Sequence, residues 1–126
     1  MILDTNALSA MADGEPPQLE QLLQRADEIA MPVIVLGEYR YGIRQSRHRT
    51  RYERWLAETV VNCRVLTVDE GTAGCYAEIR DELKRKGRPI PANDLWIAAL
   101  VRQHALPLLS RDQHFDGIPG LKRIGW

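Results

Sequence analysis

Cysteine is scarce in this sequence. The 126 residues include only Cys63 and Cys75, and neither has a second Cys or His at the spacing of a zinc site. Two cysteines do not make the dense disulfide framework of small secreted domains. We therefore expect both to be small buried apolar side chains, and a disulfide between them is the less favoured alternative.

Long apolar runs are also absent. No segment approaches the ~20 apolar residues that cross a bilayer, and residues 1–4 lack the basic region and apolar run of a signal peptide. We therefore expect a cytoplasmic protein without membrane contact. A chain of 126 residues that is 44% hydrophobic is large enough for one core and too small for two, so we expect one domain over 1–126.

Neither sign of charge dominates, because 17 Lys and Arg balance 17 Asp and Glu. This balance alone argues against a nucleic-acid partner, but the distribution argues for one. If a bound metal ion neutralised four of the acidic residues, the remaining accessible surface would be basic and would suit a phosphate backbone. The alternative is an ordinary solvated helix face. The arginines predicted to contact phosphate gather in one segment: Arg44, Arg47, Arg49, Arg51 and Arg54.

Short apolar runs alternate with amphipathic segments, which is typical of βαβ units around a parallel sheet. We expect an α/β fold with four or five strands. The expected strands are 1–3, 31–34, 64–68, 107–110 and 121–124. The expected helices are 5–12, one opened by Pro16 and Pro17, one that follows residue 34, and then 49–61, 69–86 and 92–104. The last of these is apolar almost all round, which predicts a central position.

Acidic residues stand at the ends of these elements: Asp4, Glu38, Asp94 and Asp112. Carboxylates that leave the strands of an open α/β sheet at one end converge on a single crevice. Two such charges ~4 Å apart repel by roughly 1 kcal/mol in water and by ~4 kcal/mol at an effective dielectric of 20. Mg²⁺ or Mn²⁺ would relieve this repulsion, since these ions take oxygen ligands, and the acids could hold one ion or two.

Each acid taken alone also has a structural interpretation. Asp4 could cap a helix, and for that residue alone the cap is favoured. Asp94 in a first helical turn gains from the helix dipole, so ligand and cap are evenly balanced there. Asp112 could be a turn residue, and a Glu on a helix, such as Glu38, is ordinarily exposed. His114 could contact substrate but is not predicted to be catalytic. The metal hypothesis therefore depends on the set.

With these acids placed, the sequence resembles the PIN-domain ribonucleases, and most closely the VapC-type toxins of toxin–antitoxin pairs. The matching segments are Leu3-Asp4-Thr5-Asn6, Glu38-Tyr39-Arg40-Tyr41-Gly42-Ile43, Asn93-Asp94-Leu95-Trp96-Ile97-Ala98-Ala99 and Leu109-Ser110-Arg111-Asp112-Gln113-His114-Phe115. They occur in the family's order over nearly the whole chain. The resemblance implies one PIN-like α/β/α sandwich with a central parallel sheet. Only three residues precede the first Asp, fewer than is usual, so we expect a weak first strand.

The resemblance also implies an activity. It implies a Mg²⁺- or Mn²⁺-dependent endoribonuclease that hydrolyses phosphodiester bonds of tRNA or rRNA with an activated water. The catalytic, metal-binding residues would be Asp4, Glu38, Asp94 and Asp112. Thr5, Asn6 and Ser110 would hold carboxylates or meet phosphate, and the role of Asp116 stays open. A homodimer and a VapB-like antitoxin, whose arginine would enter the acidic crevice, are the implied protein partners.

Two alternatives remain at this point. A non-catalytic PIN-like module would bind RNA or protein without cutting, although such a module would be expected to have lost one of the four acids. A phosphatase with an aspartyl nucleophile also begins with an Asp after its first strand. That chemistry needs a second Asp two residues later, where this chain has Asn6.

Overall fold

The fold is described from a computed structural model that covers residues 1–126. Five parallel strands form one sheet in the order β3-β2-β1-β4-β5. The strands are β1 (Ile2–Leu3), β2 (Ala30–Pro32), β3 (Arg64–Leu66), β4 (Leu108–Leu109) and β5 (Arg123–Ile124). The helices are α1 (Thr5–Ala12), α2 (Pro17–Gln24), α3 (Val33–Arg44), α4 (Arg49–Val60), α5 (Glu70–Arg85), α6 (Ala92–His104) and the 3₁₀ turn η1 (Gln113–Gly117). The predicted α/β class is confirmed.

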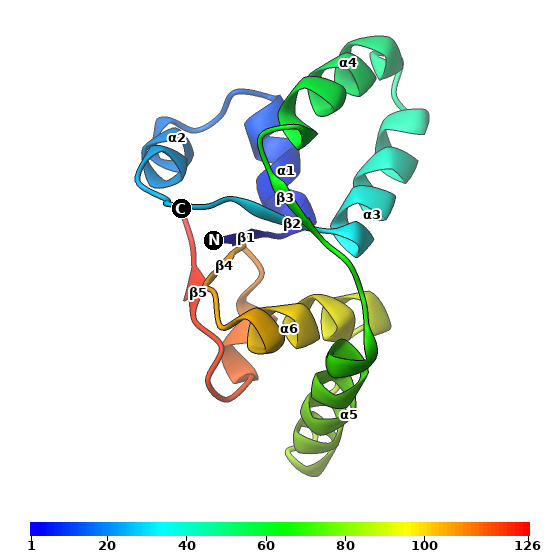
Figure 1. The fold of residues 1–126 in the computed structure, drawn as a ribbon, viewed down its shortest axis with the longest axis vertical. Helices are drawn as coiled ribbons and strands as arrows, with labels where there is room; N and C mark the ends of the chain where they lie inside the picture. The colour runs from blue at the N-terminus through cyan, green and yellow to red at the C-terminus, as the bar shows by residue number, and fades with distance from the viewer.

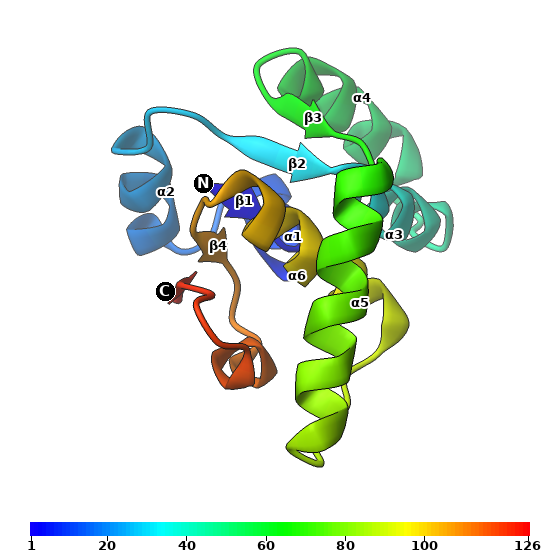
Figure 2. The ribbon, with the colours of Figure 1, turned by 60° about the horizontal axis from the view of Figure 1, so that its bottom comes forward.

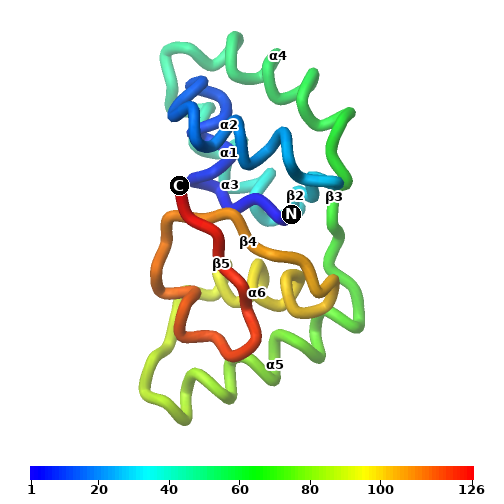
Figure 3. Tube along the Cα trace, turned by 90° about the vertical axis from the view of Figure 1, so that its left-hand side faces the viewer, coloured from blue at the N-terminus to red at the C-terminus, as the bar shows by residue number.

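Helices cover both faces of this sheet. Helices α1, α2, α3 and α4 lie on one side of the strands, and α5 and α6 lie on the other (Figure 1). Figure 2 shows α5 running alongside α6, and Figure 3 shows the sheet between the two layers from the side. The molecule is therefore an α/β/α sandwich. None of its helices combines the length and the apolarity that a bilayer crossing requires.

The first strand is short, as predicted, but it is the centre of the sheet. Ile2 and Leu3 are fully buried. β1 pairs with β2 on one side, where Ile2 faces Ala30, and with β4 on the other. The expectation of a weak strand was therefore wrong, because a strand with neighbours on both sides and helices on both faces gains its stability from burial and not from length.

The direction of the chain across the sheet reverses next to β1. From β1 the sheet grows through β2 to β3 on one side, and the chain then returns to add β4 and β5 on the other. Ligands of open α/β sheets bind outside the carboxyl ends of the strands at such a switch point. Asp4 directly follows β1 and Ser110 directly follows β4, so both stand at this position.

The second strand ends earlier than the sequence predicted. We expected residues 31–34 to be extended, but β2 ends at Pro32 and α3 begins at Val33. The β-branched residues Val33 to Val35 favour a strand locally. In the helix, however, Val35, Leu36, Tyr39 and Ile43 form a stripe that is buried in the core, and burial outweighs the smaller local preference. Glu38 consequently lies in the second turn of α3 and not at a strand end.

Helix α6 occupies the central position that its composition predicted. The positions that are buried are Leu95, Ile97, Ala98, Ala99, Leu100 and Val101. A helix buried on this much of its circumference is held rigidly by its neighbours. Its first turn, which carries Asp94, is thus a firm support for a functional side chain.

The expectation for the cysteines was wrong in part. Cys63 and Cys75 are free thiols, and both are only half-buried. Cys63 lies in the turn between α4 and β3, at the margin of the core, and Cys75 lies on α5. Partial burial raises the pKa of the Cys63 thiol. These positions explain why neither side chain is fully enclosed.

Candidate metal centre

Asp4 is the most buried of the four acidic residues of the site. It is 5% exposed, and the Ser110 hydroxyl donates a 2.6 Å hydrogen bond to its Oδ2 atom. This contact continues the β1–β4 register, in which Leu3 faces Leu109. The backbone N–H of Asp4 also donates to the Leu109 carbonyl at 3.1 Å. Strand pairing therefore fixes both ends of the contact.

Two neighbours in α1 complete the hydrogen bonds of Asp4. The backbone N–H of Thr5 donates to Oδ1 at 2.8 Å, so Asp4 is also the N-cap of α1. The Asn6 amide donates to Oδ2 at 3.1 Å, and its oxygen accepts from the N–H of Arg111 at 3.2 Å. The cap and the site interpretations of Asp4 are thus both consistent with the structure, because one oxygen caps the helix while the other faces Ser110.

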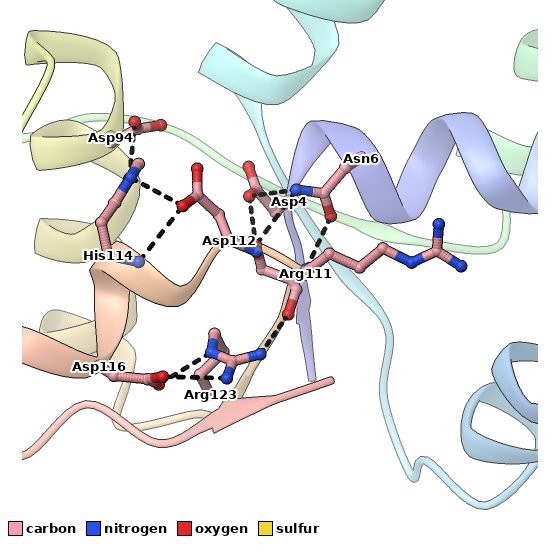
Figure 4. A network of polar contacts seen from close by, with 9 residues as sticks. Asp4, Asn6, Asp94, Arg111, Asp112, His114, Asp116 and Arg123 are labelled. Carbon is pink, nitrogen blue, oxygen red and sulfur yellow. Dashed lines mark hydrogen bonds and ion pairs between the residues drawn. The ribbon is translucent and has the colours of Figure 1, made fainter. Parts of the chain in front are cut away.

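Asp94 and Asp112 meet around one histidine (Figure 4). Nε2 of His114 lies 3.0 Å from Asp94 Oδ2, and its Nδ1 lies 2.7 Å from Asp112 Oδ1. Asp112 is also the N-cap of η1 and accepts from the His114 backbone N–H at 3.3 Å. The Asp112 N–H in turn donates to the Ser110 hydroxyl at 3.0 Å. Ser110 therefore links this group to Asp4.

Asp94 has no capping hydrogen bond from its side chain. It stands in the first turn of α6, whose N-cap is Pro91 and which lacks a side-chain cap. Burial raises the pKa of Asp94, and the nearby carboxylates of Asp4 and Asp112 raise it further, while His114 opposes the shift. A purely structural acid at a helix N-terminus would be stabilised by its surroundings. Here the surroundings disfavour its charge.

Glu38 faces the same group from α3. Burial raises its pKa, and the charges of Asp94 and Asp4 raise it further. The Thr5 hydroxyl opposes this rise in the pKa of Glu38, although neither that hydroxyl nor Glu38 Oε1 has a partner of good hydrogen-bond geometry. A buried acceptor without a partner is unfavourable by roughly 1–3 kcal/mol. The crevice therefore concentrates negative charge that the protein itself does not fully compensate.

The donors in this crevice fit a divalent cation. Asp94, Asp112 and His114 can each offer one ligand atom, and these atoms lie within 4.8 Å of one another. Carboxylate oxygens are the ligands that Mg²⁺ and Mn²⁺ prefer, and a cation would relieve the repulsion that raises the two pKa values. The residues present are therefore suited to hold a metal.

Asp116 is not brought into this group. It is exposed, and Arg123 binds both its oxygens, through Nε at 2.8 Å and through one terminal nitrogen at 2.9 Å. The guanidinium beside it holds the pKa of Asp116 below its ordinary value. The other terminal nitrogen of Arg123 donates to the Ser110 carbonyl at 3.0 Å. Asp116 thus holds Arg123, as Figure 4 shows, and Arg123 in turn binds the backbone at Ser110.

Sequence reasoning missed two of these roles. Nothing singled out Arg123, because its partners are Asp116 and a backbone carbonyl brought near by the sheet. His114 was expected at most to contact substrate, and its place between Asp94 and Asp112 was not predicted. The one available signal for its position was that it follows Asp112 by two residues in a short turn. Two side chains at this spacing in a turn can lie on the same side of the backbone.

The predicted arginines lie on the helical layer beside α3. Arg44 and Arg47 are exposed and form no ion pair. Arg49 pairs with Glu53 at 2.7 Å, and the guanidinium of Arg51 lies 5.1 Å from the centre of the Tyr52 ring. The five predicted arginines are Arg44, which ends α3, Arg47 in the following turn, and Arg49, Arg51 and Arg54 on α4.

The sequence matches the PIN domain family over residues 1–121. This chain belongs to the PIN domain family. Its relatives include ribonuclease VapC5 of Mycobacterium tuberculosis, with 34% identity over 98% of this chain and 90% of the relative. Toxin FitB of Neisseria gonorrhoeae is 30% identical over 89% of this chain and 87% of that protein.

Solved structures agree with this PIN assignment. VapBC2 of Rickettsia felis, bound to a promoter DNA fragment, contains a similar chain with a TM-score of 0.89 and 27% identity over 99% of this chain and 97% of that one. FitAcB of Neisseria gonorrhoeae gives a TM-score of 0.83 and 26% identity over 98% and 95% of the two chains. The predicted PIN-like fold and the resemblance to VapC toxins are confirmed.

The opposite environments of Asp4 and Glu38 predict opposite effects on stability in the metal-free PIN domain. Asp4→Asn places an amide N–H against existing donors and should lower the free energy of unfolding by roughly 1–3 kcal/mol. Glu38→Gln should raise it at pH 7, because the pKa of Glu38 is raised on folding and its ionisation therefore opposes folding.

The sign of the pH dependence follows from the raised pKa. The stability of the parent protein should fall as the pH rises from 4.5, the ordinary value, through the raised pKa, and the advantage of Glu38→Gln should vanish below 4.5. Urea denaturation in EDTA across this pH range measures both variants. A destabilised Glu38→Gln protein at pH 7 would show that the carboxylate is stabilised by the fold.

Proposed function

We propose that this chain is the toxin of a VapBC-type pair and cleaves RNA internally in a reaction that needs Mg²⁺ or Mn²⁺. The observation that carries the proposal is the convergence of Asp4, Glu38, Asp94 and Asp112 at the switch point of the sheet, with raised pKa values at Glu38 and Asp94. The relatives named ribonuclease VapC support the same activity. One relative is named a tRNA(fMet)-specific endonuclease, which supports structured RNA as the substrate class.

The proposed roles follow from the contacts of each residue. Asp4 is a rigid ligand, because three hydrogen bonds hold its carboxylate. Asp94 and Asp112 complete the ligand set from the other side of the crevice. A bound divalent ion supplies charge neutralisation at the phosphate and lowers the pKa of a nearby water. Glu38, whose raised pKa favours proton uptake, is placed to accept a proton from the attacking water.

Two hollows flank the acids and suit an extended strand. One, of about 300 Å³, is lined by Glu38 and Thr5 and reaches Ser46, between Arg44 and Arg47. The other, of about 370 Å³, is lined by His114 together with Gln113 and Arg88. A substrate strand that crosses the crevice would thus run from the hollow at Ser46 to the hollow that Arg88 lines, with its scissile phosphate at the acids.

The alternative is a PIN-like module that binds RNA or protein without cutting it. Such a module would be expected to have lost at least one of the four acidic residues, and this chain has all four. Catalysis and binding are separable by experiment, since a binding module needs no intact carboxylate.

Asp94→Asn should lower the rate of metal-dependent RNA cleavage by about 10²-fold or more, because it removes a ligand charge from the centre. The measurement is cleavage of a labelled structured RNA with Mg²⁺ and with Mn²⁺. The matched control is Asp81→Asn, which removes an exposed carboxylate paired with Arg85 on α5. If Asp94→Asn cleaves as fast as the control, or if the parent protein binds RNA without cleaving it, the nuclease proposal is wrong.

We propose that Arg44 and Arg47 contact RNA phosphates, since both are exposed and both adjoin in sequence a residue that lines the hollow next to Glu38, Ile43 and Ser46 respectively. Each phosphate contact contributes roughly −0.7 to the slope of log affinity against log salt for single strands. Replacing both by Gln should flatten the slope by about 1.4. Fluorescence anisotropy with cleavage-deficient Asp94→Asn protein measures this slope.

The control for this experiment removes the same charge from the amino-terminal side of β2 and β3, away from the strand ends that carry the acids. Arg25 is exposed beyond α2, and Arg64 begins β3 and pairs with Glu28. Arg25→Gln with Arg64→Gln should leave the slope unchanged. Equal slopes for all three proteins would mean that the cluster is a solvated face or a protein interface.

We also propose that a VapB-like antitoxin inhibits the chain and that the inhibited assembly contains two copies of it. The neighbouring structures are VapBC and FitAB complexes, and a guanidinium is the side chain best able to bind paired carboxylates. Co-expression with the adjacent small reading frame should give a complex that contains two 14.4 kDa toxin chains by light scattering. Replacing the arginines in the partner's C-terminal segment should restore RNA cleavage. Inhibition that survives this change would reject the arginine mechanism.

A further inference from the structure

His114 occupies the centre of the metal site, although its residue type is not one that Mg²⁺ favours. Figure 4 shows its side chain between Asp94 on α6 and Asp112 before η1. Its side chain is 33% exposed, against 20% for that of Asp94. The imidazole is thus partly open to solvent between the two carboxylates, and a metal bound there would meet it.

Asp112 positions the imidazole from its outer nitrogen. Nδ1 lies 2.7 Å from Asp112 Oδ1, while the other oxygen of Asp112 points away from the ring (Figure 4). This contact restrains the imidazole ring next to the two carboxylates.

The other ring nitrogen, Nε2, has no hydrogen-bond partner although it is buried. Asp94 Oδ2 lies only 3.0 Å away from it. Burial raises the pKa of Asp94, and without an ion this contact is a charge pair that lowers it. Neighbouring ligands of an octahedral ion, each at ~2.1 Å, are separated by about 3.0 Å, so the observed spacing suits two ligands of one ion.

We propose that Nε2 of His114 is a ligand of the metal, together with Asp94 and Asp112, and that it gives the site a preference for Mn²⁺ over Mg²⁺. The inference rests on the proposed metal-dependent function and specifies its ion. The ligand atoms of these three residues lie within 4.8 Å of one another. Imidazole nitrogen binds first-row transition ions readily, whereas Mg²⁺ strongly prefers oxygen. A carboxylate-only site would lack this selectivity.

Pulsed electron paramagnetic resonance of the full chain with one equivalent of Mn²⁺ tests the ligand directly. The parent protein should show modulation from one coordinated ¹⁴N nucleus, and His114→Gln should not. His104→Gln is the matched control, since His104 ends α6 away from the acids, and it should keep the signal. Absence of the nitrogen signal in the parent protein, or its persistence in His114→Gln, would overturn the proposal.

Titration calorimetry then tests the selectivity without reference to activity. His114→Gln should bind Mn²⁺ at least about 10-fold more weakly and should bind Mg²⁺ within about 3-fold of the parent protein, because Gln still offers an oxygen. An unchanged Mn²⁺ affinity would reject the ligand. RNA cleavage by the parent protein in Mg²⁺ is measured alongside. Cleavage without a nitrogen signal rejects only this inference, and a nitrogen signal without cleavage rejects only the nuclease.

Discussion

The hydrogen bond from Ser110 to Asp4 ties the site to the sheet. It spans 2.6 Å between the residues that follow β1 and β4, so it forms only when those strands pair in register. Ser110 also accepts from the N–H of Asp112, which carries the contact on to His114 and Asp94. A shift of one residue would send these side chains to the opposite face, and the acidic group would not assemble.

The same geometry creates an electrostatic problem. Burial and mutual repulsion raise the pKa values of Glu38 and Asp94, so the metal-free crevice opposes its own ionisation. The chain itself compensates only part of this negative charge, through hydrogen bonds to Asp4 and contacts of His114 with two carboxylates. Functional sites commonly hold such unfavourable groups, and the surrounding fold stabilises them. Here the buried β1 and α6 provide that support.

Much of the fold was predictable from local pattern. The segment 5–12 was predicted as a helix with the bounds it has, and the apolar helix 92–104 was placed correctly at the centre. The errors occurred where local and tertiary preferences conflict. Residues 33–35 favour a strand by composition, yet they begin α3 because the helix buries Val35, Leu36 and Tyr39. The strands were predicted longer than they are, because a strand ends where its hydrogen bonds to the neighbouring strand end, and that pairing is a tertiary property.

The sequence by itself determined which groups are the candidates for the chemistry, because the four acids stand in motifs typical of PIN domains and their residue types define the ligands available. It also determined the alternation of strands and helices, since apolar periodicity is a local property. The tertiary structure alone decided that Asp116 binds Arg123 and that His114 lies between Asp94 and Asp112. These contacts join residues from separate elements, and their distances depend on sheet register and helix packing, which no local pattern encodes.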